Sequence, residues 1–145
     1  NIIDFPSLKT LTIGNESFKQ TTSLTLSTLL SLETVEIGDN CFKSIANSIH
    51  INSFPELVSL KIGRYSFYDE TSENRVNCTF QLFNCSQLFS IEIGEYSFGK
   101  YEGILNLLSL PALQNLTIGS IENESNNFMY SPKLYLGCIM NCILV

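Results

Sequence analysis

The residues that could carry acid–base chemistry are few and scattered. The chain has one histidine, His50, which stands between Ile49 and Ile51. A nucleophilic triad or a metal site needs partners around that histidine, and the sequence concentrates none there. Glu33 and Glu36 form the nearest thing to a carboxylate pair, but no cleft is indicated, and we expect both on a solvated face. The sequence therefore predicts no catalytic residue and no enzyme.

The five cysteines do not form a complete metal motif either. Cys138 and Cys142 have the spacing of half a zinc site and lack two further ligands. A disulfide between Cys78 and Cys85 stays open as an alternative if the chain is secreted. No glycine-rich phosphate loop is present, because the regularly spaced glycines belong to the repeat described below. We expect no metal and no cofactor.

Composition narrows the possible partners. With 145 residues the chain can form one domain with a sizeable core. Its formal net charge is -6, and nucleic-acid binding needs a basic face, so we expect no nucleic-acid partner. The longest apolar run, residues 138–145, is too short to cross a bilayer, so we expect no membrane span within this segment. Because the first residue is Asn1 and not Met, we expect the chain to begin inside a longer protein.

An internal repeat organises the sequence. Five Ile-Gly pairs occur, and their glycines follow one another at spacings of 24, 25, 31 and 25 residues. A leucine stands six residues before each glycine, and a phenylalanine stands four residues after each of the first four. The glycines are Gly14, Gly38, Gly63, Gly94 and Gly119, and the phenylalanines are Phe18, Phe42, Phe67 and Phe98.

A second apolar set recurs upstream of each leucine at constant offsets. Leu24, Leu26 and Leu29 lead to Leu32, and three later units repeat that spacing. In this register Cys85 occupies a core position, and Cys41 occupies a position that is serine in three other units: Ser17, Ser66 and Ser97.

These two sets predict the architecture. In L-x-x-L-x-I the last two apolar positions alternate at period 2, which is typical of a strand with one buried face. One such strand cannot bury its face alone, but units stacked in parallel can. We predict parallel strands over 8–14, 32–38, 57–63, 88–94 and 113–119, with the final isoleucine of each buried. The glycine that follows favours either a positive φ or close stacking of the backbone, and the second set predicts a short strand or extended turn on the opposite wall.

The pattern resembles the leucine-rich-repeat family, whose strand signature is L-x-x-L-x-I. The I-G-x-x-S-F strings at 13–18, 62–67 and 93–98 are most similar to the BspA-type branch. The resemblance implies a repeat solenoid, mainly β, with a parallel sheet on the concave face and short strands or turns on the convex side. It covers 1–121, with the first unit cut mid-repeat, and it leaves 122–145 as a diverged terminal cap or poorly ordered tail. The column where the commonest pattern carries an asparagine ladder reads Glu16, Asn40, Tyr65, Tyr96 and Ile121.

The outward side chains of the strands are the candidate binding surface. Val58 and Phe89 are apolar residues at equivalent positions of adjacent units, and an apolar pair beside aromatic residues is typical of interfaces. We expect one patch made by seven residues: Val58, Tyr65, Phe89, Tyr96, Glu36, Lys61 and Glu92. An alternative is that Tyr65 and Tyr96 only stack on each other to cover the turn. The insertion 68–79 is a competing site.

The resemblance implies partner recognition or adhesion, so the sequence predicts a non-catalytic scaffold that binds a protein, with a glycan as the alternative ligand. We expect a cell-surface or secreted location, and an intracellular scaffold is the second interpretation. A third is a recognition segment appended to an enzyme or signalling protein whose catalytic part lies outside these residues.

Overall fold

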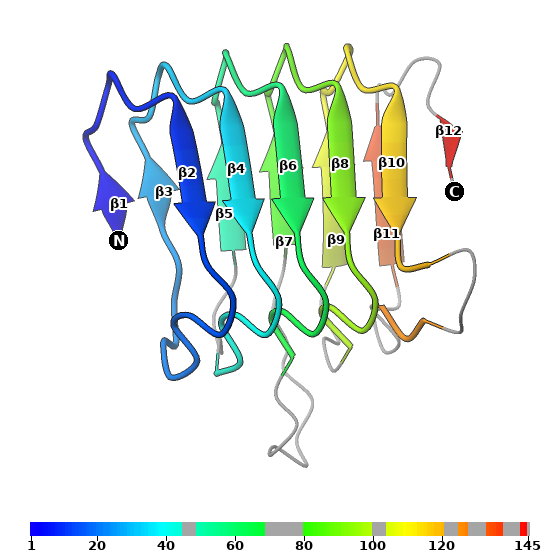
Figure 1. Ribbon diagram of the computed structural model, residues 1–145. Helices are drawn as coiled ribbons and strands as arrows, with labels where there is room; N and C mark the ends of the chain where they lie inside the picture. Colours follow the sequence, from blue (N-terminus) through cyan, green and yellow to red (C-terminus); the bar gives the residue numbers. More distant parts are fainter. Residues whose placement is uncertain are drawn as a thin grey trace.

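The computed structural model describes residues 1–44, 49–68, 80–99, 104–120, 125–127, 133–137 and 143–144. Within these residues every regular element is a β-strand, and Figure 1 shows the strands stacked as two walls of one solenoid. No helix in this part of the chain is long and apolar enough to span a membrane.

The first wall is a six-stranded parallel sheet in the order β12-β10-β8-β6-β4-β2. Equivalent residues of successive units lie side by side, so that Thr34 pairs with Ser59 and Ser59 pairs with Ser90. This parallel pairing confirms the prediction made from the L-x-x-L-x-I pattern. The strands are β2 (Thr10–Ile13), β4 (Thr34–Ile37), β6 (Ser59–Ile62), β8 (Ser90–Ile93), β10 (Asn115–Ile118) and β12 (Ile143–Leu144).

The second wall is also made of parallel strands. A four-stranded sheet has the order β11-β9-β7-β5, and β1 pairs with β3 beside it. The second apolar set therefore forms strands, one of the two forms predicted for it. β11 and β12 extend both walls into the segment after residue 121. The strands are β1 (Ile2–Ile3), β3 (Leu26–Ser27), β5 (Ile49–Asn52), β7 (Phe80–Phe83), β9 (Ile104–Leu108) and β11 (Lys133–Gly137).

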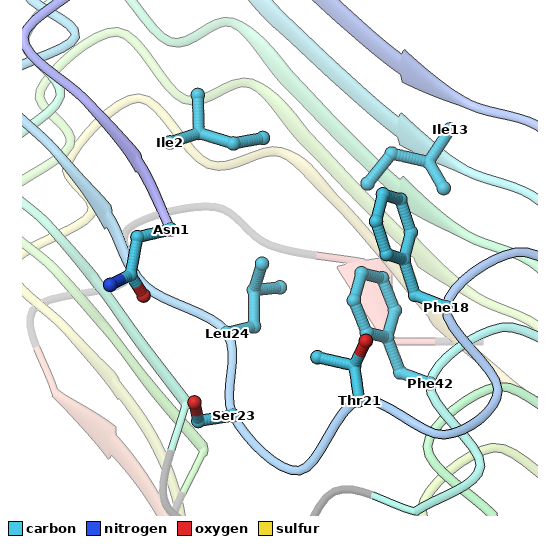
Figure 2. Close-up of a pocket in the computed structure, with 8 residues that line it drawn as sticks. All are labelled: Asn1, Ile2, Ile13, Phe18, Thr21, Ser23, Leu24 and Phe42. Atoms are coloured by element: carbon cyan, nitrogen blue, oxygen red, sulfur yellow. The ribbon is translucent and has the colours of Figure 1, made fainter.

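The phenylalanine column fills the solenoid beside the turns. The rings of Phe18, Phe42, Phe67 and Phe98 stack nearly parallel, with centroids 5.3, 5.1 and 4.8 Å apart in that order. Figure 2 shows the first two rings face to face. Phe42, Phe67 and Phe98 are fully buried, whereas Phe18 is 55% exposed. Phe18 is the first ring of the column and is stacked on one side alone.

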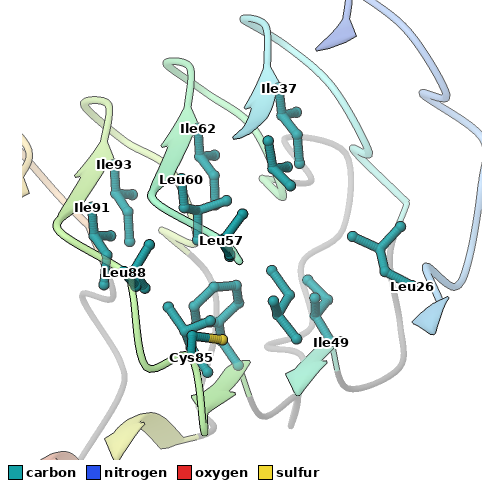
Figure 3. Close-up of a cluster of buried hydrophobic side chains, with 14 of the residues drawn as sticks. Leu26, Ile37, Ile49, Leu57, Leu60, Ile62, Cys85, Leu88, Ile91 and Ile93 are labelled. Carbon is teal, nitrogen blue, oxygen red and sulfur yellow. The ribbon is translucent and has the colours of Figure 1, made fainter. Parts of the chain in front are cut away.

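Leucine and isoleucine side chains from both walls form most of the rest of the core. Figure 3 shows Ile37, Ile62 and Ile93 in one row, because each unit places the same side chain at the same depth. These three isoleucines and Ile13 are buried as predicted, but Ile118 is only partly buried. That part of the prediction is wrong: in the described part of the chain β12 pairs with Asn115 and Leu116 but not with Ile118.

A ladder of serine hydroxyl groups links the turns inside the solenoid. The Ser66 hydroxyl donates to the Gly38 carbonyl at 2.8 Å and accepts from the Cys41 amide at 3.1 Å. The Ser97 hydroxyl makes the same two bonds one unit later, to the Gly63 carbonyl at 2.6 Å and from the Ser66 amide at 3.2 Å. Because these backbone groups lie in the interior, each needs a partner there. At positions 66 and 97 serine therefore contributes hydrogen bonds as well as a small side chain.

Candidate functional site

Val58 and Phe89 lie side by side on the first wall. They directly precede β6 and β8, and the Phe89 amide donates to the Val58 carbonyl at 2.8 Å. Val58 is 45% exposed and Phe89 is 41% exposed, so neither side chain is needed to complete the core. The equivalent positions in the neighbouring units hold polar residues: Lys9, Glu33 and Gln114. The sequence prediction that these two residues are adjacent and exposed is confirmed.

A column of alternating charge crosses the outer face of the same strands. Glu36 is in register with Lys61, and Lys61 is in register with Glu92. All three are exposed, and Lys61 Nζ lies 3.4 Å from Glu92 Oε1. Exposed pairs of this kind contribute about 0–1 kcal/mol to stability, so the column matters more for partner approach than for folding.

A second alternating column runs through the turns, and the sequence analysis missed it. Arg64 Nε lies 3.9 Å from Asp39 Oδ2, and Arg64 Nη1 lies 3.9 Å from Glu95 Oε2. The signal was present, because these residues each follow the repeat glycine and alternate in sign. The β6 unit therefore carries two cations, Lys61 and Arg64, each flanked by acids of the β4 and β8 units.

Tyr65 and Tyr96 lie at the other end of β6 and β8 from Val58 and Phe89. Their rings stack 4.8 Å apart with an interplanar angle of 2°, and Tyr68 meets Tyr65 edge-on at 6.2 Å. Both stacked tyrosines are half-buried. The strand that separates the apolar pair from the tyrosine pair has four residues and is about 13 Å long. All seven candidate residues thus belong to the units of β4, β6 and β8, but they form two groups with charges between them.

Two other surface features lie outside the seven candidate residues. Lys9 Nζ donates to Glu33 Oε1 at 2.7 Å, and this hydrogen bond raises the pKa of the Lys9 ammonium group. On the second wall, Leu108 at the end of β9 is 37% exposed, which is close to the exposure of Phe89. Leu108 therefore matches Phe89 in hydrophobic character and exposure while lying on the opposite wall.

The residues considered for catalysis lie largely outside the described part of the structure. His50 lies in β5, and its side chain falls outside the described part of the structure, as do Cys78, Cys138 and Cys142. Burial raises the pKa of the Cys41 thiol, and burial likewise raises the pKa of the Cys85 thiol. Such thiols are poor nucleophiles at neutral pH because the thiolate is the reactive form. Among the described residues no group of three potential metal ligands occurs.

Comparison with known proteins adds no relative to these observations. No family model, no curated protein and no solved structure matches the chain.

Proposed function

We propose that this chain is a non-catalytic binding scaffold of the leucine-rich-repeat type, whose partner is another protein. The partner docks on the outer face of the six-stranded sheet over β6 and β8. One observation carries the proposal. Val58 and Phe89 are adjacent, large and exposed, at a position where the neighbouring units hold polar side chains.

The energetics favour an interface at this pair. Covering a fully exposed phenylalanine contributes about 1.5–3 kcal/mol, and Phe89 has 41% of its surface available. Val58 adds to that gain on the same partner. Both residues flank strands held by parallel pairing on each side, so little entropy is lost when they are covered. The pair therefore acts as the apolar centre of the interface.

The charges beside this centre set the chemistry of the partner. Lys61 lies between Glu36 and Glu92, and Arg64 lies between Asp39 and Glu95. A complementary surface presents an apolar side chain to Phe89 and acidic groups to the two cations, with basic groups on either side. Charges at the edge of an interface mainly change the association rate and its salt dependence.

The stacked tyrosines extend this surface across the two units. Both rings stay partly accessible while the stack fixes their orientation, which suits a contact at low entropic cost. Stacked aromatic rings also suit a glycan, which is the competing ligand. The resemblance of the repeat to BspA-type units supports recognition at a cell surface or outside the cell.

A photo-crosslinking amino acid placed at position 89 tests this function in extracts or on cells of the source organism. We expect a protein adduct at position 89 and none at position 108, the matched position on the second wall. The adduct should disappear when Val58→Ser is added, with the fold unchanged by circular dichroism.

Three results would contradict the proposal. Equal labelling at positions 89 and 108 would mean nonspecific contact. An adduct that is lost on glycosidase treatment would identify a glycan. Crosslinking that depends on the insertion 68–79 and not on Val58 would move the site to that insertion.

A further inference from the structure

The repeat glycines are required by close contact between successive units. A Cβ at Gly63 would lie 2.5 Å from the Gly38 carbonyl carbon, and at Gly94 it would lie 2.8 Å from the Gly63 carbonyl carbon. A Cβ at Gly38 would likewise lie 2.9 Å from the Gly14 carbonyl carbon. None of these three glycines has a positive φ. A side chain is therefore excluded by the backbone of the preceding unit.

Gly14 differs from these three glycines, and so does Gly119, the last glycine of the column, whose φ is 86°. A Cβ at Gly14 would meet nothing within 4 Å, and the φ of Gly14 is not positive. No contact in the described structure accounts for glycine at this position. Glycine at position 14 is explained if a further unit packs against Gly14 in the way that the Gly14 backbone packs against Gly38.

Two other residues of the first unit, Ser17 and Phe18, also differ in their described contacts from the equivalent residues of later units. Ser66 and Ser97 each donate to the glycine carbonyl of the preceding unit, whereas Ser17 makes one long bond, 3.5 Å, to the Asn15 carbonyl. Phe18 is 55% exposed, although its three equivalents are buried between rings or beside the second wall.

An apolar hollow lies at this end of the solenoid. It has a volume of about 230 Å³, and Ile2, Ile13, Phe18, Leu24 and Phe42 contribute to its lining. Figure 2 shows these side chains converging on it from both walls. Ile3 in β1 and Phe5 just after it are exposed, and in the described part of the chain β2 has a strand neighbour on one edge alone.

We propose that this end face, made by β1, β2 and the turn from Gly14 to Phe18, is a docking surface for one further unit of the same repeat. The added strand pairs in parallel with β2, its turn crosses Gly14, and a large apolar side chain stacks on Phe18. Its glycine carbonyl accepts the Ser17 hydroxyl. The contacts that join successive repeat units in the solenoid are thereby repeated once more at this end.

The path of the chain assigns this unit to the same polypeptide. In each unit a strand of the first wall leads through its turn into the second-wall strand of the next unit, as β2 leads into β3. β3 pairs with β1, and Ile2 is in register with Leu26. The strand that fits beside β2 is therefore the one whose turn leads directly into β1.

A tandem duplication tests the surface. A copy of residues 2–25 inserted before Ile2 keeps the register, because Ile2 takes the place that Leu26 holds after Thr25. Gly14→Ala is then compared in the parent and in the duplicated chain, at the original position, by urea unfolding followed with circular dichroism. Gly38→Ala, which clashes in both chains, is the control.

We expect Gly14→Ala to leave the urea midpoint of the parent unchanged or slightly raised, since nothing is near the new methyl group. The duplicated chain should have a higher midpoint than the parent, and Gly14→Ala should lower it as Gly38→Ala does. A neutral Gly14→Ala in the duplicated chain, or a duplicated chain no more stable than the parent, would overturn the proposal. If the parent self-associates in sedimentation velocity and Gly14→Ala disrupts the association, the occupant is a second copy and the assignment to the same polypeptide is wrong.

Discussion

Truncation of Phe67 to alanine probes the aromatic column at its centre. Phe67 is 1% exposed and stacks between Phe42 at 5.1 Å and Phe98 at 4.8 Å. Replacing a buried phenylalanine by alanine costs about 3–5 kcal/mol. Each lost ring pair contributes about 0.5–1.5 kcal/mol beyond buried area, so we expect a value near the upper end of that range. A loss of this size is a large share of the about 5–15 kcal/mol that stabilises a typical domain.

Phe18→Ala is the matched control for this substitution. Phe18 occupies the same column with nearly the same backbone, φ 54° against 56°, but it is 55% exposed and has one ring neighbour. Full burial of a phenylalanine contributes about 1.5–3 kcal/mol, so less than half of that, about 1 kcal/mol, should be lost. Urea unfolding followed by far-ultraviolet circular dichroism measures both variants. Equal losses for Phe67→Ala and Phe18→Ala would refute the assignment of the column to the core.

Two further predictions concern the turns and the buried thiols. Ser97→Ala should cost about 1–3 kcal/mol, because the Gly63 carbonyl and the Ser66 amide lose their partner. Cys41→Ser should be nearly neutral, because a hydroxyl can donate to the Gly14 carbonyl as the thiol does at 3.1 Å. Urea midpoints of the two variants check both expectations. Burial raises the pKa of Cys41 and of Cys85, so the folded state favours both protonated thiols. The stability that this preference contributes is present below the ordinary thiol pKa of about 8.5 and declines as the pH rises above it. Peptide mapping after iodoacetamide treatment at pH 8 should find both residues unlabelled in the native chain and labelled in urea, and labelling of the native chain would contradict their burial.

Much of the fold follows from residue spacing alone. Period-2 alternation within each unit and constant offsets between units determine which side chains face inward, so the parallel register and the buried Ile37, Ile62 and Ile93 were predictable. The lower burial of residues at the ends of the stack was not predictable from spacing. Phe18 and Ile118 carry the same pattern as their buried equivalents, but among the described residues Phe18 stacks on one ring and Ile118 has no partner in β12, and a pattern of single units does not encode that.

The turn chemistry was harder to predict. The commonest leucine-rich-repeat pattern predicts an asparagine ladder in the column of Glu16 and Asn40, but those residues adopt left-handed backbone conformations. The amide ladder lies one residue earlier, where Asn15 Oδ1 accepts from the Asp39 amide at 2.9 Å and Asp39 Oδ1 accepts from the Arg64 amide at 2.8 Å. Which column turns its side chains toward the backbone depends on φ, which spacing does not reveal.

The candidate surface was predictable as a set of residues but not as an arrangement. In-register stacking makes Val58 and Phe89 neighbours, and spacing reveals that directly. The tyrosine stack was an open alternative, and the structure places it at the far end of the strands with the rings 4.8 Å apart. Arg64 was overlooked because its contacts to Asp39 and Glu95 cross three units and depend on side-chain reach.

A disulfide-trapping measurement tests most directly whether stacked units bring Val58 and Phe89 together into one surface. Neighbouring parallel strands lie about 4.8 Å apart, within the range of Cα separations of about 4.4–6.8 Å that a disulfide spans. The double variant Val58→Cys/Phe89→Cys should form this bond under mild oxidation, identified by mass spectrometry of the linked peptides. Val58→Cys/Leu108→Cys, whose positions lie on opposite walls, should not. Equal crosslinking of the two pairs, or none at 58 and 89 in a folded chain, would contradict the stacked arrangement on which the proposed binding surface depends.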